Sequence, residues 1–385
     1  MSGNEQGGPL RHGSLWAFPL RGWFLLLSVC GLVAVGLTVL LSAGGGGDRF
    51  LGTYFTRQLV WFGIAFLVGG AAFLFGIERL RILSWPLALG SLALLAVVLV
   101  PGIGVEVNGA RRWIAAGPFR FQPSEFAKIG FLCLMAWYVA RNGRKMESFV
   151  PGFLLPCLIV APFAALIVLE PDLGTSVLYA AVGGALLLVA GASVWSLSAT
   201  GALFLAGVSA LILYDPERLD RVTSFLDLEA NRGGGGYQLW QGILGFSVGG
   251  LEGAGPGRGR QHLSFLPEAH TDFIFAVVGE ELGFLATGGV VLLFVLFTIL
   301  ALSQIRKAPD LFGFTFVFGA LLFIVGQAMI NMGVVTGLLP TKGMSLPFIS
   351  YGGSNLVVMG VLTGFILSTF REWEAPVIRR PVEIT

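Results

Sequence analysis

Cysteine and histidine are both scarce in this chain of 385 residues. It has three of each, at Cys30, Cys133, Cys157, His12, His262 and His270. The cysteines lie in apolar runs, their number is odd and their spacing fits no metal-ligand pattern, so we expect buried, small apolar side chains. The histidines form no cluster. The sequence therefore indicates neither a disulfide framework nor a metal site.

Charge is the second scarcity. Only 12% of the residues are charged and 55% are hydrophobic, whereas soluble domains are about 25% charged. Disordered chains are poor in apolar residues, and a soluble protein of this length could not hide so much apolar surface from water. No block of Lys and Arg resembles a nucleic-acid patch. We therefore expect a membrane protein with no nucleic-acid partner.

Long apolar runs make up most of the chain. About ten of them have membrane length, and they predict an all-α polytopic fold because lipid offers no partners for free backbone groups. Only residues 191–193 separate the sixth run from the seventh, so one long helix is the alternative there. The expected spans are 21–42, 57–77, 82–101, 123–140, 149–169, 173–190, 194–213, 271–300, 311–336 and 348–370.

The distribution of Lys and Arg predicts the orientation. Ten spans place both termini on one side, where the short loops carry seven of these residues against three in the opposite short loops. Cytoplasmic loops are enriched in such cations, so we expect both termini in the cytoplasm. The predicted organisation is a tail at 1–20, one transmembrane domain at 21–370 and a tail at 371–385.

Two long loops, 101–122 and 214–270, then face outward, the second between helices seven and eight. Both carry arginines, which is unusual on the translocated side. Pairing with nearby Asp and Glu is one explanation, and an anionic ligand on the outer side is the other. The second loop is glycine-rich, and its apolar stretch Gln238–Val248 predicts a short helix at the interface.

Asp272 is the strongest candidate for chemistry. It follows His270 and Thr271 where the second outer loop meets an apolar helix. A partly dehydrated carboxylate has a raised pKa and is a better base. The alternative is a helix start, with Thr271 or Asp272 as the N-cap.

Arg111, Arg112 and Lys128 are the candidate phosphate ligands of the first outer loop and the helix after it. Together they could form a cationic corner. Pairing of Lys128 with Glu125, three residues earlier, is the alternative.

The acidic turn Glu170–Thr175 lies between two predicted spans and could be only a helix cap. Near the end of the chain, Lys342 adds to the outer cations. The small residues at Ser350, Gly352 and Gly353 enter an apolar run, where they could simply allow close helix packing.

The order and spacing of these motifs resemble the SEDS family (shape, elongation, division and sporulation), which includes FtsW, RodA and SpoVE. The resemblance covers nearly the whole chain, and Leu339–Gly343 and Pro267–Phe275 are more similar to the FtsW branch than to RodA. The chain departs from the family pattern at Glu252, His262 and Asn355. The motifs that carry the resemblance are Asn108–Ile114, Gln122–Lys128, Glu170–Thr175, Leu266–Gly283 and Gly337–Ser354.

The resemblance implies a peptidoglycan glycosyltransferase that polymerises lipid II into β-1,4 glycan strands at the division septum, in the bacterial cytoplasmic membrane. It implies a class B penicillin-binding protein as transpeptidase partner, together with other membrane proteins of the divisome. Asp272 falls on the essential family aspartate, and Trp113 on a functionally sensitive aromatic. The expected substrate-binding residues are Arg111, Arg112, Trp113, Gln122, Ser124, Glu125, Lys128, His270, Thr271, Lys342, Ser350, Gly352 and Gly353.

A single base suits this chemistry. Pyrophosphate leaves as a stabilised anion, so the second carboxylate that glycosidases need is unnecessary. A divalent cation would assist, although no ligand cluster in the sequence indicates one. Two alternatives remain: a flippase for lipid II, and a scaffold that only activates a transpeptidase.

Overall fold

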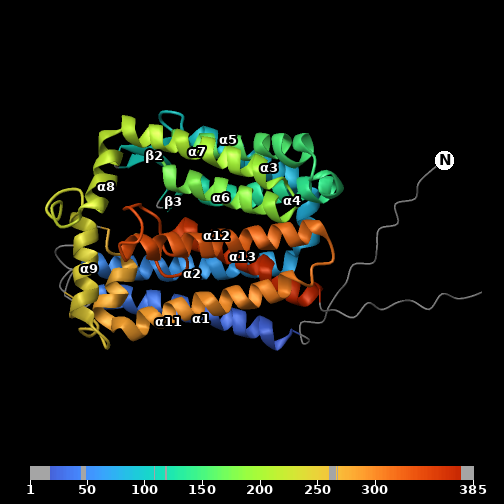
Figure 1. The fold of residues 1–385 in the computed structure, drawn as a ribbon. Helices are drawn as coiled ribbons and strands as arrows, with labels where there is room; N and C mark the ends of the chain where they lie inside the picture. Colours follow the sequence, from blue (N-terminus) through green and yellow to red (C-terminus); the bar gives the residue numbers. More distant parts are fainter. Residues whose placement is uncertain are drawn as a thin grey trace, which may run out of the picture.

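The computed structural model describes residues 18–44, 49–107, 109–117, 119–259, 266 and 268–373. Long helices run side by side in one bundle, and short elements gather at one end of it (Figure 1). Most of the two predicted tails lies outside the described residues, as do Asn108, His262 and Pro267.

Each apolar run predicted from the sequence contains one helix. Eight of the described helices are long and apolar enough to cross a membrane by length and composition. The multi-span helical fold is therefore confirmed, while the count of ten spans stays a prediction. The helices are α1 (Leu20–Gly44), α2 (Arg49–Phe75), α3 (Ile77–Val98), α4 (Pro123–Asn142), α5 (Leu155–Leu169), α6 (Leu173–Val189), α7 (Val194–Tyr214), α11 (Ile274–Ile305), α12 (Leu311–Val335) and α13 (Gly353–Glu372).

Short-range signals explain several helix ends. Asp172 caps α6 by accepting a hydrogen bond from Thr175 N, which satisfies a backbone donor that the first turn leaves free. Asp310 caps α12 in the same way. Gly191, with φ of 95°, follows α6 and lets the chain turn into α7. The two helices are therefore separate, and the single long helix considered for this region is wrong. A turn of π-helix, Val150–Leu154, leads into α5, and a 3₁₀ turn, Gly143–Lys145, follows α4.

The loop 101–122, which the sequence predicts to face outward, contains a small antiparallel sheet that the apolar runs did not predict. Its strands are β1 (Gly104–Val107), β2 (Ala110–Ala116) and β3 (Phe119–Phe121), in the order β1-β2-β3. Ile114 of β2 lies opposite Gly104 on one side and Phe121 on the other. Since successive side chains of a strand point to opposite faces, the adjacent Arg111 and Arg112 diverge.

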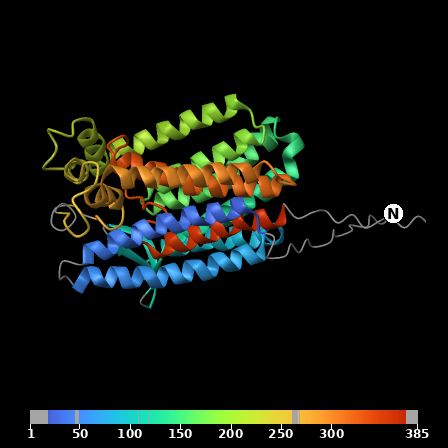
Figure 2. The same cartoon turned by 90° about the horizontal axis from the view of Figure 1, so that it is seen from below.

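Two short helices, α8 (Pro216–Leu226) and α9 (Tyr237–Gly249), lie across the same end of the bundle as the sheet (Figure 1). The helix α9 confirms the one predicted for Gln238–Val248. We call this end the site end. The first and last described segments meet at the opposite end, where the rings of Phe18 and Phe370 are 6.4 Å apart. Figure 2 shows the bundle from below, with α7 at its margin.

The helix α11 is broken near its start. Gly283 has φ of 77° and ψ of −174°, far from helical values. The glycine-rich loop fills the break: Ala254 N donates to Glu280 O at 2.8 Å and Phe284 N donates to Gly250 O at 2.8 Å. These bonds replace those lost from the helix, as buried backbone requires. The first piece of α11, which begins two residues after Asp272, is therefore fixed by the loop before it.

Candidate active site

Asp272 lies just before α11 at the site end. The N-cap of α11 is Phe273 and no side chain caps it, so the predicted N-cap role of Thr271 or Asp272 is wrong. Asp272 is half-buried. Within the described part of the chain, the only hydrogen bond to this residue reaches its backbone carbonyl, from Asn331 Nδ2 at 2.7 Å. Its carboxylate is therefore available for chemistry.

The surroundings of Asp272 tune its acidity. Burial is the main cause that raises the pKa of its carboxyl group to about 7; the nearby carboxylates of Glu268 and Asp172 contribute to this rise, and Arg112 opposes it. Loss of solvation disfavours the charged form of an acid. Near neutral pH the group therefore exists in both protonation states, which suits a general base.

A lysine approaches from the loop after α12. A Cβ on Gly343 would lie 2.8 Å from Asp272 Oδ2, so this loop passes directly beside the carboxylate. The side chain of Lys342 lies over Gly174, where a Cβ would come within 2.8 Å of its Cγ. Burial lowers the pKa of the Lys342 ammonium to about 8, partly offset by Asp172. It therefore remains mostly cationic at neutral pH.

The two adjacent arginines of β2 have different partners. Arg112 donates to Glu170 O at 3.0 Å and to Pro171 O at 2.6 Å, and so ties the sheet to the turn between α5 and α6. Arg111 forms an exposed ion pair with Glu106 at 3.2 Å. Pairing with a nearby carboxylate, the simpler explanation of the arginines in the two long loops, thus holds for Arg111, and Arg218 pairs likewise with Asp215.

The turn between α5 and α6 brings two more carboxyl groups. Glu170 is fully buried, and within the described residues neither of its side-chain oxygens has a hydrogen-bond partner. Burial, reinforced by Asp172, raises the pKa of Glu170 to about 9, so this group is protonated at neutral pH. Asp172 binds Thr175 Oγ1 at 2.9 Å as well as its backbone N–H, which confirms the cap.

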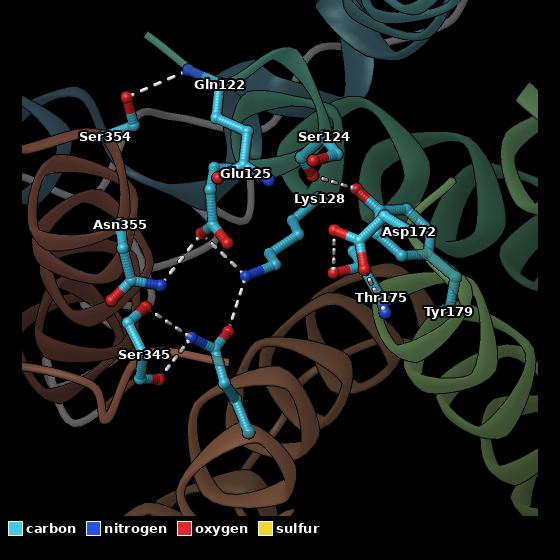
Figure 3. Close-up of polar contacts among 11 residues, drawn as sticks. Gln122, Ser124, Glu125, Lys128, Asp172, Thr175, Tyr179, Ser345, Ser354 and Asn355 are labelled. Atoms are coloured by element: carbon cyan, nitrogen blue, oxygen red, sulfur yellow. Dashed lines mark hydrogen bonds and ion pairs between the residues drawn. The ribbon is translucent and has the colours of Figure 1, made fainter. Parts of the chain in front are cut away.

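A second polar group, which we call the Lys128 network, consists of Glu125, Lys128, Gln327, Ser345 and Asn355 (Figure 3). Lys128 donates to Glu125 Oε2 and to Gln327 Oε1, both at 2.7 Å, and is fully buried. Asn355 also donates to Glu125 Oε2, at 2.9 Å. Gln327 Nε2 donates to Ser345 O at 2.8 Å. The ammonium of Lys128 therefore lies inside this network and not on the predicted cationic surface, and the predicted ion pair with Glu125 is confirmed.

Gln122 and Ser124 contact their neighbours through the backbone. Gln122 N donates to Ser354 Oγ at 3.0 Å, and the Tyr179 hydroxyl donates to Ser124 O at 2.7 Å (Figure 3). Trp113 is half-buried on β2. Substrate contacts of these side chains stay predictions.

Most of the other candidates near Asp272 contact neighbouring residues of the protein. His270 packs against Tyr54, with ring centroids 4.5 Å apart, and Thr271 donates to Glu268 Oε2 at 2.9 Å. Gly353 lies so close to Trp61 that a Cβ would come within 2.6 Å of its Nε1, which favours the close-packing explanation there. Gly352 precedes it as the N-cap of α13.

Gln327 and Asn331 were not predicted from the sequence. Each is an isolated polar residue within the apolar helix α12. Their only signal is a hydrogen-bonding side chain at membrane depth, where such groups need partners. The approach of Lys342 over Gly174 was not predicted either. Within the described ranges, no group of three or more His, Cys, Asp or Glu side chains could hold a metal ion.

Comparison with known protein families gives a match over nearly the whole chain. The family model for the FtsW, RodA and SpoVE cell cycle proteins matches residues 20–374. The chain belongs to this family. The resemblance seen in the sequence is thereby confirmed.

Relatives agree at the level of whole chains. One, the probable peptidoglycan glycosyltransferase FtsW of Thioalkalivibrio sulfidiphilus, is 40% identical over 90% of this chain and 89% of its own. The probable peptidoglycan glycosyltransferase FtsW of Nitrosococcus halophilus is 39% identical over 94% of this chain and 95% of its own.

Solved structures share the fold. A chain from work on structural coordination of polymerization and crosslinking by a peptidoglycan synthase complex aligns with a TM-score of 0.77 and 29% identity, over 94% of this chain and 99% of that one. The rod shape determining protein RodA of Thermus thermophilus aligns with a TM-score of 0.70 and 29% identity, over 94% and 99%.

Proposed function

We propose that this chain polymerises lipid II into β-1,4 glycan strands at the site end of the bundle, with Asp272 as the general base. The chain is a peptidoglycan glycosyltransferase of the FtsW type, like the relatives it matches over most of its length. One observation carries the assignment of the base: the Asp272 carboxylate accepts no hydrogen bond from the described residues and has its pKa raised to about 7. A carboxylate free of partners and poised near neutral pH can take a proton from a hydroxyl.

The reaction balances with one base. Asp272 takes the proton of the acceptor's 4-hydroxyl as its oxygen attacks the anomeric carbon of the donor sugar. The bond from that carbon to the polyprenyl pyrophosphate breaks, and pyrophosphate leaves as an anion. Direct displacement inverts the anomeric carbon and gives the β-linkage. No general acid is required, unlike in glycosidases.

Lys342 is the cation best placed to stabilise the developing pyrophosphate charge. Its neighbour Gly343 lies against Asp272, and its stem crosses the start of α6. Fixed cations are most effective where water is excluded. Arg112 contributes by holding the turn that carries Asp172. An assisting divalent cation stays a prediction.

The partner would be a class B penicillin-binding protein, with other membrane proteins of the divisome. The likeness to a chain of a peptidoglycan synthase complex supports a transpeptidase partner. The FtsW-type relatives support a place at the division septum in the bacterial cytoplasmic membrane. The site end would face outward and both termini the cytoplasm.

The test is polymerisation of purified lipid II by the full-length protein with its cognate transpeptidase partner. Asp272→Asn should abolish glycan product. Asp310→Asn is the matched control, because it makes the same change at the opposite end and Asn is an equally good N-cap. Undiminished product from Asp272→Asn would contradict the base assignment. Movement of lipid II between leaflets without glycan product would indicate the flippase. No glycan product from the wild type, with crosslinking by the partner unaffected by Asp272→Asn, would indicate the scaffold.

A further inference from the structure

The short segment Glu268–Phe273, which carries Asp272, has no regular structure of its own before α11 begins. Among the described residues, the hydroxyl and the backbone N–H of Thr271 bond only locally, to Glu268. Glu268 has φ of 52°, a value that non-glycine residues rarely adopt and that surrounding structure must hold in place. The position of the Asp272 carboxylate therefore depends on whatever fixes this backbone.

Three consecutive carbonyls of the segment are held from outside. Tyr351 N donates to His270 O at 2.9 Å. The Ser350 hydroxyl donates to Thr271 O at 2.6 Å, and Asn331 Nδ2 donates to Asp272 O at 2.7 Å. Two of the three donors are thus side chains, one from α12 and one from the loop before α13.

These donors are themselves held. Ser350 Oγ accepts a hydrogen bond from Leu346 N at 2.7 Å, and Ser350 O accepts one from Gln58 Nε2 of α2 at 3.1 Å. Asn331 Nδ2 also donates to Met344 O at 2.6 Å. Phe348, two residues before Ser350, has φ of 67°, so this loop too is in a conformation that its contacts must maintain.

Burial separates this role from substrate binding. The exposed fractions of Ser350 and Asn331 are 4% and 1%. The Ser350 hydroxyl and Asn331 Nδ2 bond to the backbone of the 268–273 segment and of the loop before α13, so these groups are already used within the protein. The small serine predicted from the sequence as a substrate ligand thus has a different use.

We infer that Ser350 and Asn331 are positioning residues that set the place of the Asp272 carboxylate by clamping the backbone on which it stands. This inference rests on the proposed function, since it matters for the reaction only if Asp272 is the base. Displacement of a reacting group by about 1 Å costs up to roughly a hundredfold in rate. The clamp also keeps Asp272 at its present depth, facing Glu268 on its own segment, Asp172 at the start of α6 and Arg112 on β2.

The test compares the full-length protein, in complex with its transpeptidase partner, as wild type and as Ser350→Ala. We expect kcat for lipid II polymerisation to fall on the order of tenfold to a hundredfold, with KM little changed. The acid limb of the pH profile should move to lower pH, because a looser segment lets water reach Asp272 and its pKa falls toward the ordinary value. Ser350→Thr, which keeps the hydroxyl, should restore most of the rate and the original limb.

Ser368→Ala is the matched control, a buried serine whose hydroxyl binds Phe365 O at 2.8 Å within α13. It should leave rate and limb unchanged. Asn331→Leu tests the second donor independently and should shift the acid limb in the same direction. It therefore also serves as the test if Ser350→Ala does not fold. A loss of rate with an unmoved acid limb in the folded variants, or no loss at all, would overturn the inference. If Asp272→Asn retains activity, the proposed base fails instead, so the two failures can be told apart.

Discussion

Two sets of charged side chains lie at the site end and share one loop, yet their chemistry differs. In the Lys128 network, the lysine has a bond to a carboxylate on one side and to an amide on the other, and it is fully buried. Around Asp272, the carboxylate receives no bond from the described residues. The loop that joins them places Gly343 against Asp272 and Ser345 against Gln327. A buried pair costs stability when one partner is removed and has no free group for chemistry, while a half-buried carboxylate without a partner keeps its capacity to react.

The largest expected effect comes from breaking the paired side. Lys128→Met leaves Glu125 buried without its cation, and we expect a loss of about 3–5 kcal/mol of unfolding free energy. Denaturant or thermal unfolding in detergent measures it. Lys145→Met, at an exposed lysine of the opposite end, should change stability by less than about 0.5 kcal/mol. The double variant Glu125→Leu with Lys128→Met should recover most of the loss; equal stability of all variants would contradict a structural role.

The next effect separates the two arginines of β2. Arg112→Ala frees the turn before α6 by removing bonds to two carbonyls, and each charged hydrogen bond contributes about 1.5–3 kcal/mol. We expect polymerisation to fall on the order of tenfold, because the turn that carries Asp172 is no longer held in place and small misplacements near a reacting group slow the reaction. Arg111→Ala removes only an exposed ion pair, so the rate should change less than about twofold. Equal losses would show that both arginines serve the site directly.

A smaller effect is expected at the crossing of Lys342 and α6. Gly174→Ala adds a methyl group in the path of the Lys342 stem, which must move away from its present place. Initial rates of polymerisation should fall a few-fold. Gly184→Ala in the same helix meets no atom within 4 Å and should keep full activity, with a gain in helix stability of up to about 1 kcal/mol. A rate unchanged by Gly174→Ala would argue against a role for Lys342 in the reaction.

Much of the fold followed from the sequence, because lipid forces apolar runs into helices. The boundary between α6 and α7 was also predicted, from three small residues only. The sheet Gly104–Phe121 was not, since its strands are short and contain arginines. The separate fates of Arg111 and Arg112 depend on that sheet: as neighbours on a strand they face opposite ways.

Of the candidate site, Asp272 was predicted because a carboxylate at the edge of an apolar helix is rare. Asn331 was not predicted, and Ser350 was predicted only as a substrate ligand. Asn331 and Gln327 are single polar residues in α12, and Ser350 is one small residue among several. Apart from Leu346, which is four residues from Ser350, their partners are 13 to 292 residues away along the chain, so only the tertiary structure brings them together. Lys128 shows the converse: its predicted partner is three residues away and was found.

The pH dependence of polymerisation tests the central claim most directly. If Asp272 is the base, kcat/KM of the complex should rise with pH through about 7, because only the deprotonated carboxylate accepts the hydroxyl proton and burial has raised the pKa of that group. The control Asp310→Asn should show the same limb, and Asp272→Asn should show no activity to titrate. A limb near pH 4, about the ordinary value for aspartate, would contradict the account.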